Sequence, residues 1–134
     1  MKNSSTLINP GIIEIRSIPK KGRGAFAKID IPKGTVIEIA PVIPMTLQEA
    51  QTISKTVVHF YTFEWHEKDQ ETGVEYDSAI ISGYGQMLNH SEKPNAEFIW
   101  DYPNRNIIMK SLKNIKAGEE ITHDYGCDLW FNPE

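Results

Sequence analysis

The sequence predicts a mainly β domain with little helix. Short segments rich in β-branched and aromatic residues recur along the chain, and clusters of Gly, Pro, Asn and Asp separate them. A helix start signal is recognised at one place in the middle of the chain. The chain has 134 residues, of which 40% are hydrophobic, so residues 1–134 are expected to form a single globular domain.

The first forty residues are expected to hold three short strands, at 11–18, 25–27 and 35–39. Residues 11–18 read GIIEIRSI, which alternates and is β-branched, as is typical of a strand with one buried face. A glycine-rich loop over 19–24 and a turn over 30–34 would separate the three strands.

One short helix is expected over about 46–54. Thr46 and Glu49 have the spacing of a capping box, in which the threonine hydroxyl accepts from the glutamate amide and the glutamate reaches back. The next segment, 57–65, reads VVHFYTFEW and favours a strand. Further strands are expected at 74–76, 96–100, 106–110 and 119–122, with turns at 66–73, 101–105 and 117–118.

The charge balance narrows the classes of partner. The formal net charge is −4, whereas non-specific nucleic-acid binding usually needs a basic surface, so no direct nucleic-acid binding is expected. An acidic protein suits a basic partner such as a lysine-rich peptide. There is no apolar run of about 20 residues for a membrane span and no signal-peptide pattern at the N-terminus. We therefore expect a soluble, intracellular protein.

Three motifs carry the functional information. They are the G-x-G of Gly22 and Gly24, the segment NHSEKPN at 89–95, and GEEITHDYG at 118–126. Singly, each is typical of a turn, a capped loop or a strand end. Together and in this order they resemble the SET-domain protein-lysine methyltransferases, and the segment FYTF at 60–63 resembles that family's Y-x-F strand. The resemblance runs from about residue 12 to 130 and is strongest to compact viral and bacterial members.

The resemblance implies a fold, a cofactor and a cofactor site. The fold is a β-clip of small curved sheets, in which the final segment threads under a loop and forms a C-terminal pseudoknot that brings the second and third motifs together. The cofactor is S-adenosyl-L-methionine, and glycines would let the backbone approach it closely. The cofactor-binding residues implied are Lys21, Gly22, Arg23, Gly24, Asn89, His90, Tyr125 and Trp130. For Trp130 an ordinary place in the core is the equal alternative.

The resemblance also implies catalytic and channel residues. Tyr125 matches the tyrosine whose hydroxyl orients the transferred methyl and the lysine amine, and its ordinary pKa of about 10 makes it a poor base. The alternative role for Tyr125 is a core tyrosine. Tyr61 matches the tyrosine that hydrogen-bonds the substrate amine. Phe98 and His123 would complete the substrate channel, and His123 stands where relatives often carry Phe or Tyr, which leaves the number of methyl groups added open.

The implied reaction needs a neutral lysine. Deprotonating a free lysine at pH 7 costs about 4.6 kcal/mol, and an apolar channel lowers that cost. Alignment of the reacting groups can contribute roughly 7–11 kcal/mol, so positioning outweighs deprotonation.

Two departures from the family pattern matter. Glu92 stands where many members have a zinc-binding cysteine, and Cys127 is the only cysteine of the chain, so no metal is expected. The short C-terminal tail would need Trp130, Phe131 or a second subunit to close the channel, which suggests a homodimer.

Other functions stay open at this point. The region 16–37 also resembles the SAF-type β-clip modules that bind ligands or peptides without catalysis, although these lack the second and third motifs. A SET module that binds peptide without transfer would be expected to lack Tyr125 or Asn89 and His90. A hydrolase is the third alternative, but the four histidines, His59, His66, His90 and His123, fit no metalloprotease or serine-hydrolase pattern.

Overall fold

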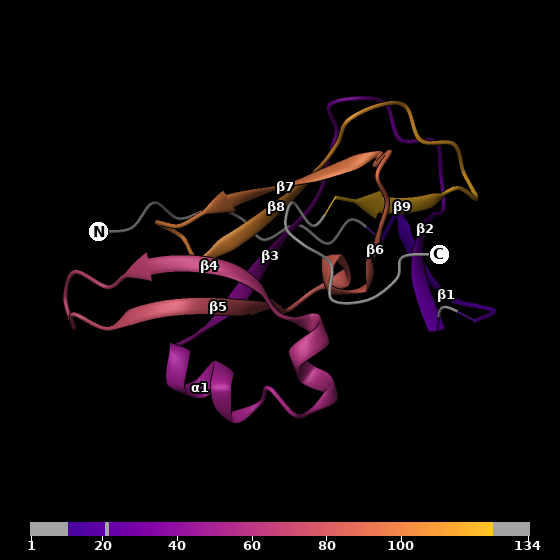
Figure 1. Ribbon diagram of the computed structural model, residues 1–134. Helices are drawn as coiled ribbons and strands as arrows, with labels where there is room; N and C mark the ends of the chain where they lie inside the picture. Colours follow the sequence, from indigo (N-terminus) through magenta and orange to yellow (C-terminus); the bar gives the residue numbers. More distant parts are fainter. Residues whose placement is uncertain (1–10, 21, 125–134) are drawn as a thin grey trace.

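The computed structural model describes residues 11–20 and 22–124, and these form two curled β-sheets (Figure 1). The smaller sheet has the strand order β1-β2-β9-β6, and the larger has the order β4-β5-β3-β8-β7. The strands are β1 (Ile13–Ile18), β2 (Gly22–Ala27), β3 (Val36–Met45), β4 (Phe63–Lys68), β5 (Glu75–Ile81), β6 (Asn89–His90), β7 (Ala96–Asp101), β8 (Asn106–Ser111) and β9 (Glu120–His123). The helical elements are α1 (Leu47–Thr52) and two 3-10 turns, η1 (Val57–Tyr61) and η2 (Tyr84–Met87). The mainly β prediction with little helix is confirmed.

The larger sheet curls until its two edge strands meet. Trp100 of β7 donates its indole N–H to the carbonyl oxygen of Glu64 in β4, at 2.8 Å, and the Trp100 ring lies 6.1 Å from that of Phe63. Inside the curl, Trp65 is fully buried with the Tyr102 ring 4.5 Å away. Burial of such large aromatic side chains supplies much of the stability of a small core.

A second core lies under the smaller sheet and joins it to β3 and β8. Its buried members are Ile13, Ala25, Ala27, Ile31, Ile37, Leu88, Ala96, Met109, Ile115 and Ile121. The loops that follow β2 and precede β9 run side by side (Figure 1) and are linked by an antiparallel bridge between Ile31 and Ile115. Among the described residues, no helix is long and apolar enough to cross a membrane.

The predicted helix is confirmed with its cap. The Thr46 hydroxyl accepts from the Glu49 amide at 3.2 Å, and the Glu49 carboxylate accepts from the Thr46 amide at 2.9 Å. The hairpins β4–β5 and β7–β8 also pair as expected.

The strand predicted over 57–65 is wrong in its first half. Residues 57–61 form η1, and β4 begins only at Phe63. Val57 and Phe60 are 68% and 55% exposed, so these apolar side chains have no pleated, half-buried surface to pack on. The preference of β-branched and aromatic residues for strands comes from packing on such a surface. Where that surface is absent, local 3-10 hydrogen bonds decide the backbone conformation.

The loop predicted over 19–24 is also wrong at its end. Gly22 and Gly24 belong to β2 and pair with Ile18 and Arg16 of β1.

Candidate functional site

Strands β6 and β9 pair in parallel, with Asn89 opposite Thr122 and His90 opposite His123. This pairing joins segments about thirty residues apart and brings the second and third motifs together, as the resemblance implied. The threading of the C-terminal residues lies outside the described part of the chain.

The Asn89 side chain ties all three motifs together. Its amide donates one hydrogen bond to the carbonyl oxygen of Arg23, at 3.0 Å, and another to the Glu120 carboxylate, at 2.7 Å. Asn89 therefore joins β6 to both β2 and β9.

Gly24 lies in close contact with the side chains at this junction. A Cβ at Gly24 would lie 2.6 Å from Cδ1 of Ile18, 2.7 Å from the Glu120 carboxylate and 3.0 Å from Nδ2 of Asn89. The close approach that the structure shows at Gly24 is to the protein's own side chains. At Gly22 the requirement is backbone conformation, because its φ of +88° lies in the left-handed region that favours glycine.

Asn95 holds the other edge of β9. Its Nδ2 donates to the carbonyl oxygen of Glu120 at 2.8 Å, and its Oδ1 accepts from the amide of Thr122 at 2.9 Å. The Asn95 side chain thus makes the two backbone hydrogen bonds that a neighbouring strand would otherwise make with β9. Asn95 belongs to the second motif, but the motif alone does not indicate this role.

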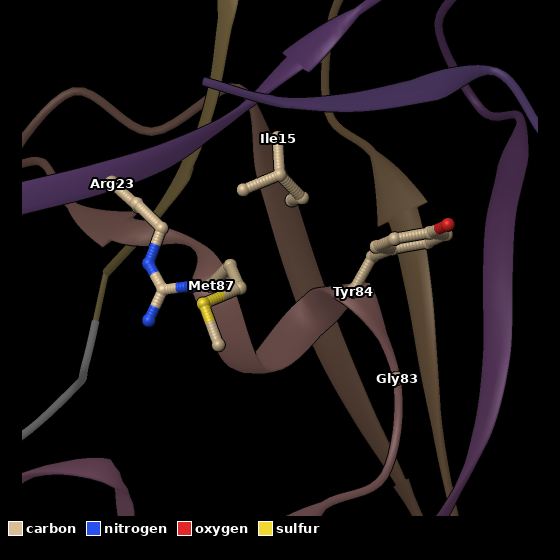
Figure 2. A pocket seen from close by; sticks show the side chains of 5 residues that line it. All are labelled: Ile15, Arg23, Gly83, Tyr84 and Met87. Atoms are coloured by element: carbon tan, nitrogen blue, oxygen red, sulfur yellow. The ribbon is translucent and has the colours of Figure 1, made fainter. Parts of the chain in front are cut away.

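A cavity of about 400 Å³ opens between β1, β2 and η2 (Figure 2). Ile15, Arg23, Gly83, Tyr84 and Met87 line it. Its size is in the range of small-molecule sites, which are mostly apolar with a few polar groups. Arg23 is the predicted cofactor residue on this lining. The other four lining residues were missed, although the glycines and apolar residues of 83–88 were an available signal.

Glu38 of β3 fixes the wall formed by η2. It is 2% exposed, and its two carboxylate oxygens accept from the backbone amides of Tyr84 and Gly85 at 2.9 and 2.8 Å. Burial raises the pKa of the Glu38 carboxyl above its usual value, and these two hydrogen bonds act in the opposite direction. A Cβ at Gly83 would lie 2.7 Å from that of Ala40, so glycine lets η2 lie flat against β3.

Two of the predicted channel residues are in contact. The Phe98 and His123 rings lie 4.3 Å apart at 32°. His123 is 8% exposed, and burial lowers its pKa to about 4, with the charge of His90 acting in the same direction and Asp124 opposing it. His123 is therefore neutral at pH 7. The His90 side chain is also buried, with Nδ1 at 3.8 Å from the Asp124 carboxylate.

Tyr61 lies at the end of η1 and is 39% exposed. Its carbonyl oxygen accepts from the side-chain amide of Gln86 in η2, at 2.6 Å. In the described part of the chain its ring makes no aromatic contact with Phe98 or His123. Of the remaining predicted residues, Lys21, Tyr125, Trp130 and Phe131 lie outside the described residues. Within 11–20 and 22–124, no group of three or more His, Cys, Asp or Glu side chains is arranged to hold a metal ion.

Comparisons with known proteins agree with the motifs. The SET domain model matches residues 22–126. A fission yeast (Schizosaccharomyces pombe) histone-lysine N-methyltransferase specific for lysine 37 of histone H3 is 37% identical over 123 residues, which are 91% of this chain and 78% of that protein. This chain spans between 13% and 42% of the length of three further curated relatives.

Solved structures share the fold. A candidate histone methyltransferase of Plasmodium falciparum superposes with a TM-score of 0.63 at 27% identity, covering 89% of this chain and 96% of that one. The Neurospora SET domain protein DIM-5, a histone lysine methyltransferase, superposes with a TM-score of 0.62 at 17% identity, over 91% of this chain and 55% of that one. The chain belongs to the SET-domain family and is a protein-lysine methyltransferase that uses S-adenosylmethionine as its methyl donor.

Proposed function

We propose that this enzyme methylates a lysine of a basic, histone-like protein and binds S-adenosylmethionine in the cavity between β1, β2 and η2. One observation carries the assignment of the cavity. Arg23 is the middle residue of the G-x-G motif and lines the cavity, while Asn89 of the second motif holds its carbonyl oxygen and also bonds Glu120 of the third.

The residues of the cavity fit this cofactor. Apolar surface for the nucleoside is provided by Ile15, Tyr84 and Met87. The Arg23 guanidinium can form a bidentate pair with the carboxylate at the amino-acid end of the cofactor. When bound, the cofactor supplies an electrophilic methyl group on a sulfonium. We assign Lys21, Gly22, Gly24, Asn89, His90, Tyr125 and Trp130 to the surroundings of this site, as the motifs predict.

The lysine channel would be formed by Tyr61, Phe98 and His123, with Tyr125 as the orienting catalytic residue. Neutral His123 suits a site that must accept an uncharged amine, because a second cation there would be repelled by the sulfonium. The Phe98 ring against His123 supplies an apolar wall that excludes water. The reaction is then dominated by alignment of the amine.

The substrate class follows from charge and from the relatives. The β4–β5 hairpin carries six carboxylates against a single lysine, namely Glu64, Glu67, Asp69, Glu71, Glu75 and Asp77 against Lys68. Arg105 pairs with two of them, Glu67 and Asp69. An acidic surface of this kind steers a basic peptide toward the enzyme. Histone-lysine methyltransferases among the relatives support the same class of substrate.

Purified chain incubated with methyl-labelled cofactor should transfer label to core histones and not to an acidic control protein, with the modified lysine identified by mass spectrometry. Calorimetry with S-adenosylhomocysteine should show one site per chain, and chelator should not change it. Binding without label transfer to any basic protein would reject the substrate. Absence of binding at millimolar ligand would reject the cavity.

We further propose that the enzyme is intracellular, makes no direct contact with nucleic acid, and acts as a homodimer whose second subunit helps to close the channel. Cytoplasm is the compartment proposed for a bacterial enzyme, and the host nucleus for a viral one. Sedimentation that shows only monomer across micromolar concentrations would contradict the dimer.

A further inference from the structure

Gln86 uses both ends of its side-chain amide on backbone groups of two different segments. Its Oε1 accepts from the amide of Ile81 at the end of β5, and its Nε2 donates to the carbonyl oxygen of Tyr61 at the end of η1, both at 2.6 Å. The side chain therefore spans from β5 through η2 to η1. Neither bond is needed to form η2, whose own turns are closed by backbone bonds.

η2 is itself held firmly at its start. The buried Glu38 carboxylate accepts from Tyr84 and Gly85. Two of the four η2 residues, Tyr84 and Met87, line the cavity. Gln86 therefore belongs to the element that forms this wall, although it does not line the cavity itself, and its amide bonds to Tyr61 of η1.

The η1 segment buries little of its surface. It has no side-chain cap at Thr56 and contains no buried residue. The closing hydrogen bond, from the Thr62 amide to the carbonyl oxygen of His59, is long at 3.4 Å. The Thr62 hydroxyl also donates to that oxygen, at 2.8 Å, but both of these bonds stay within residues 59–62, whereas the bond from Gln86 ties the segment to η2.

We propose that Gln86 is a positioning residue that couples the cofactor cavity to the lysine channel by fastening Tyr61 to η2. The inference rests on the proposed function, which assigns the cavity to the cofactor and Tyr61 to the lysine amine. Ligand that orders η2 would order the Tyr61 segment through the Gln86 amide. Transfer depends steeply on alignment, so loosening this tie should cost rate while leaving cofactor affinity intact.

The test uses the near-isosteric variant Gln86→Glu, whose carboxylate still accepts from Ile81 but cannot donate to Tyr61. Gln48→Glu is the matched control, because it makes the same amide-to-carboxylate change at an exposed position of α1, outside the acidic β4–β5 hairpin. We expect Gln86→Glu to lower kcat/KM for a basic peptide about tenfold while the Kd for S-adenosylhomocysteine changes less than about twofold. Gln48→Glu should change neither.

Hydrogen exchange measures how firmly the Tyr61 segment is held, without requiring methyl transfer. Amides 57–62 should exchange faster in Gln86→Glu than in the wild type, and S-adenosylhomocysteine should protect them in the wild type only. If Gln86→Glu does not fold, Gln86→Asn takes its place, since it keeps the amide but is too short for both partners.

An unchanged kcat/KM, an equal loss of cofactor affinity, or unchanged exchange over 57–62 would overturn the proposal. If the wild type transfers no methyl group to a basic peptide, the proposed substrate fails, but exchange over 57–62 still decides whether Gln86 fixes the Tyr61 segment.

Discussion

Asn89→Ala tests whether one side chain holds the three motifs together. The substitution removes the hydrogen bonds to Arg23 and Glu120 and adds no atoms. Both bonds join the strand β6 to neighbours in the same small sheet. The loss should therefore appear both in global stability and at the cavity that Arg23 lines.

The magnitude follows from the partners. A hydrogen bond to a carboxylate such as Glu120 contributes roughly 1.5–3 kcal/mol, and one to a neutral carbonyl such as that of Arg23 contributes about 1 kcal/mol. The free energy of unfolding should fall by about 2.5–4 kcal/mol, which for a domain of this size lowers the melting temperature by about 8–15 °C. Cofactor affinity should fall as well, because the Arg23 backbone loses its tie to β6 beside the cavity.

Urea unfolding measures the first effect, and calorimetry with S-adenosylhomocysteine measures the second. Asn104→Ala is the matched control, because Asn104 also donates its amide to a carboxylate, that of Asp101, at 2.9 Å, but within the β7–β8 turn. That variant loses one hydrogen bond to a carboxylate, roughly 1.5–3 kcal/mol, so Asn89→Ala should be less stable than Asn104→Ala by about the 1 kcal/mol of the additional bond to Arg23, and Asn104→Ala should keep wild-type cofactor affinity. An Asn89→Ala protein as stable as Asn104→Ala, with wild-type affinity, would refute the role of Asn89 as a brace.

Two further predictions concern Gly24 and Tyr125. Gly24→Ala should destabilise the fold by about 1–3 kcal/mol in urea unfolding through overpacking against Ile18 and Glu120, and a variant of unchanged stability would show that both side chains move aside freely. Tyr125→Phe should lower methyl transfer by orders of magnitude in single-turnover assays while costing about 1 kcal/mol of stability, and a variant that keeps most of the wild-type rate would reject Tyr125 as the orienting residue.

Local signals in the sequence predicted the fold class and several secondary-structure elements correctly. The capping box at Thr46 and the turns of the two hairpins depend on residues next to each other in the chain, and they were predicted correctly. The meeting of the second and third motifs was available only by resemblance, because periodicity does not specify which distant strands pair. The structure bears it out in the β6–β9 pairing.

What the sequence did not indicate depends on partners far along the chain. The two amides that bind Glu38 lie 46 and 47 residues after it, so a glutamate in an apolar strand gave no sign of its role. Asn95 likewise finds its partners in β9. The prediction for 57–61 was wrong for a related reason. Its β-branched and aromatic composition favours a strand, but among residues 11–20 and 22–124 no strand pairs with this segment.

His123 should make the stability of the fold depend on pH. Its pKa is lowered from 6.5 to about 4, so between these values the unfolded chain binds a proton that the folded chain does not. Stability is therefore full above pH 6.5 and falls as the pH drops toward 4, by about 2 kcal/mol at pH 5. Glu38 has a raised pKa and acts with the opposite sign, because its protonation favours the folded state as pH falls.

His123→Phe keeps the ring contact with Phe98 and removes only the histidine's contribution to this pH dependence. Urea unfolding at pH 7 and pH 5 should show the wild type losing about 2 kcal/mol more than His123→Phe between the two conditions. Equal losses in the two proteins would mean that His123 does not titrate as a buried neutral imidazole, and the assignment of an uncharged channel wall would fall with it.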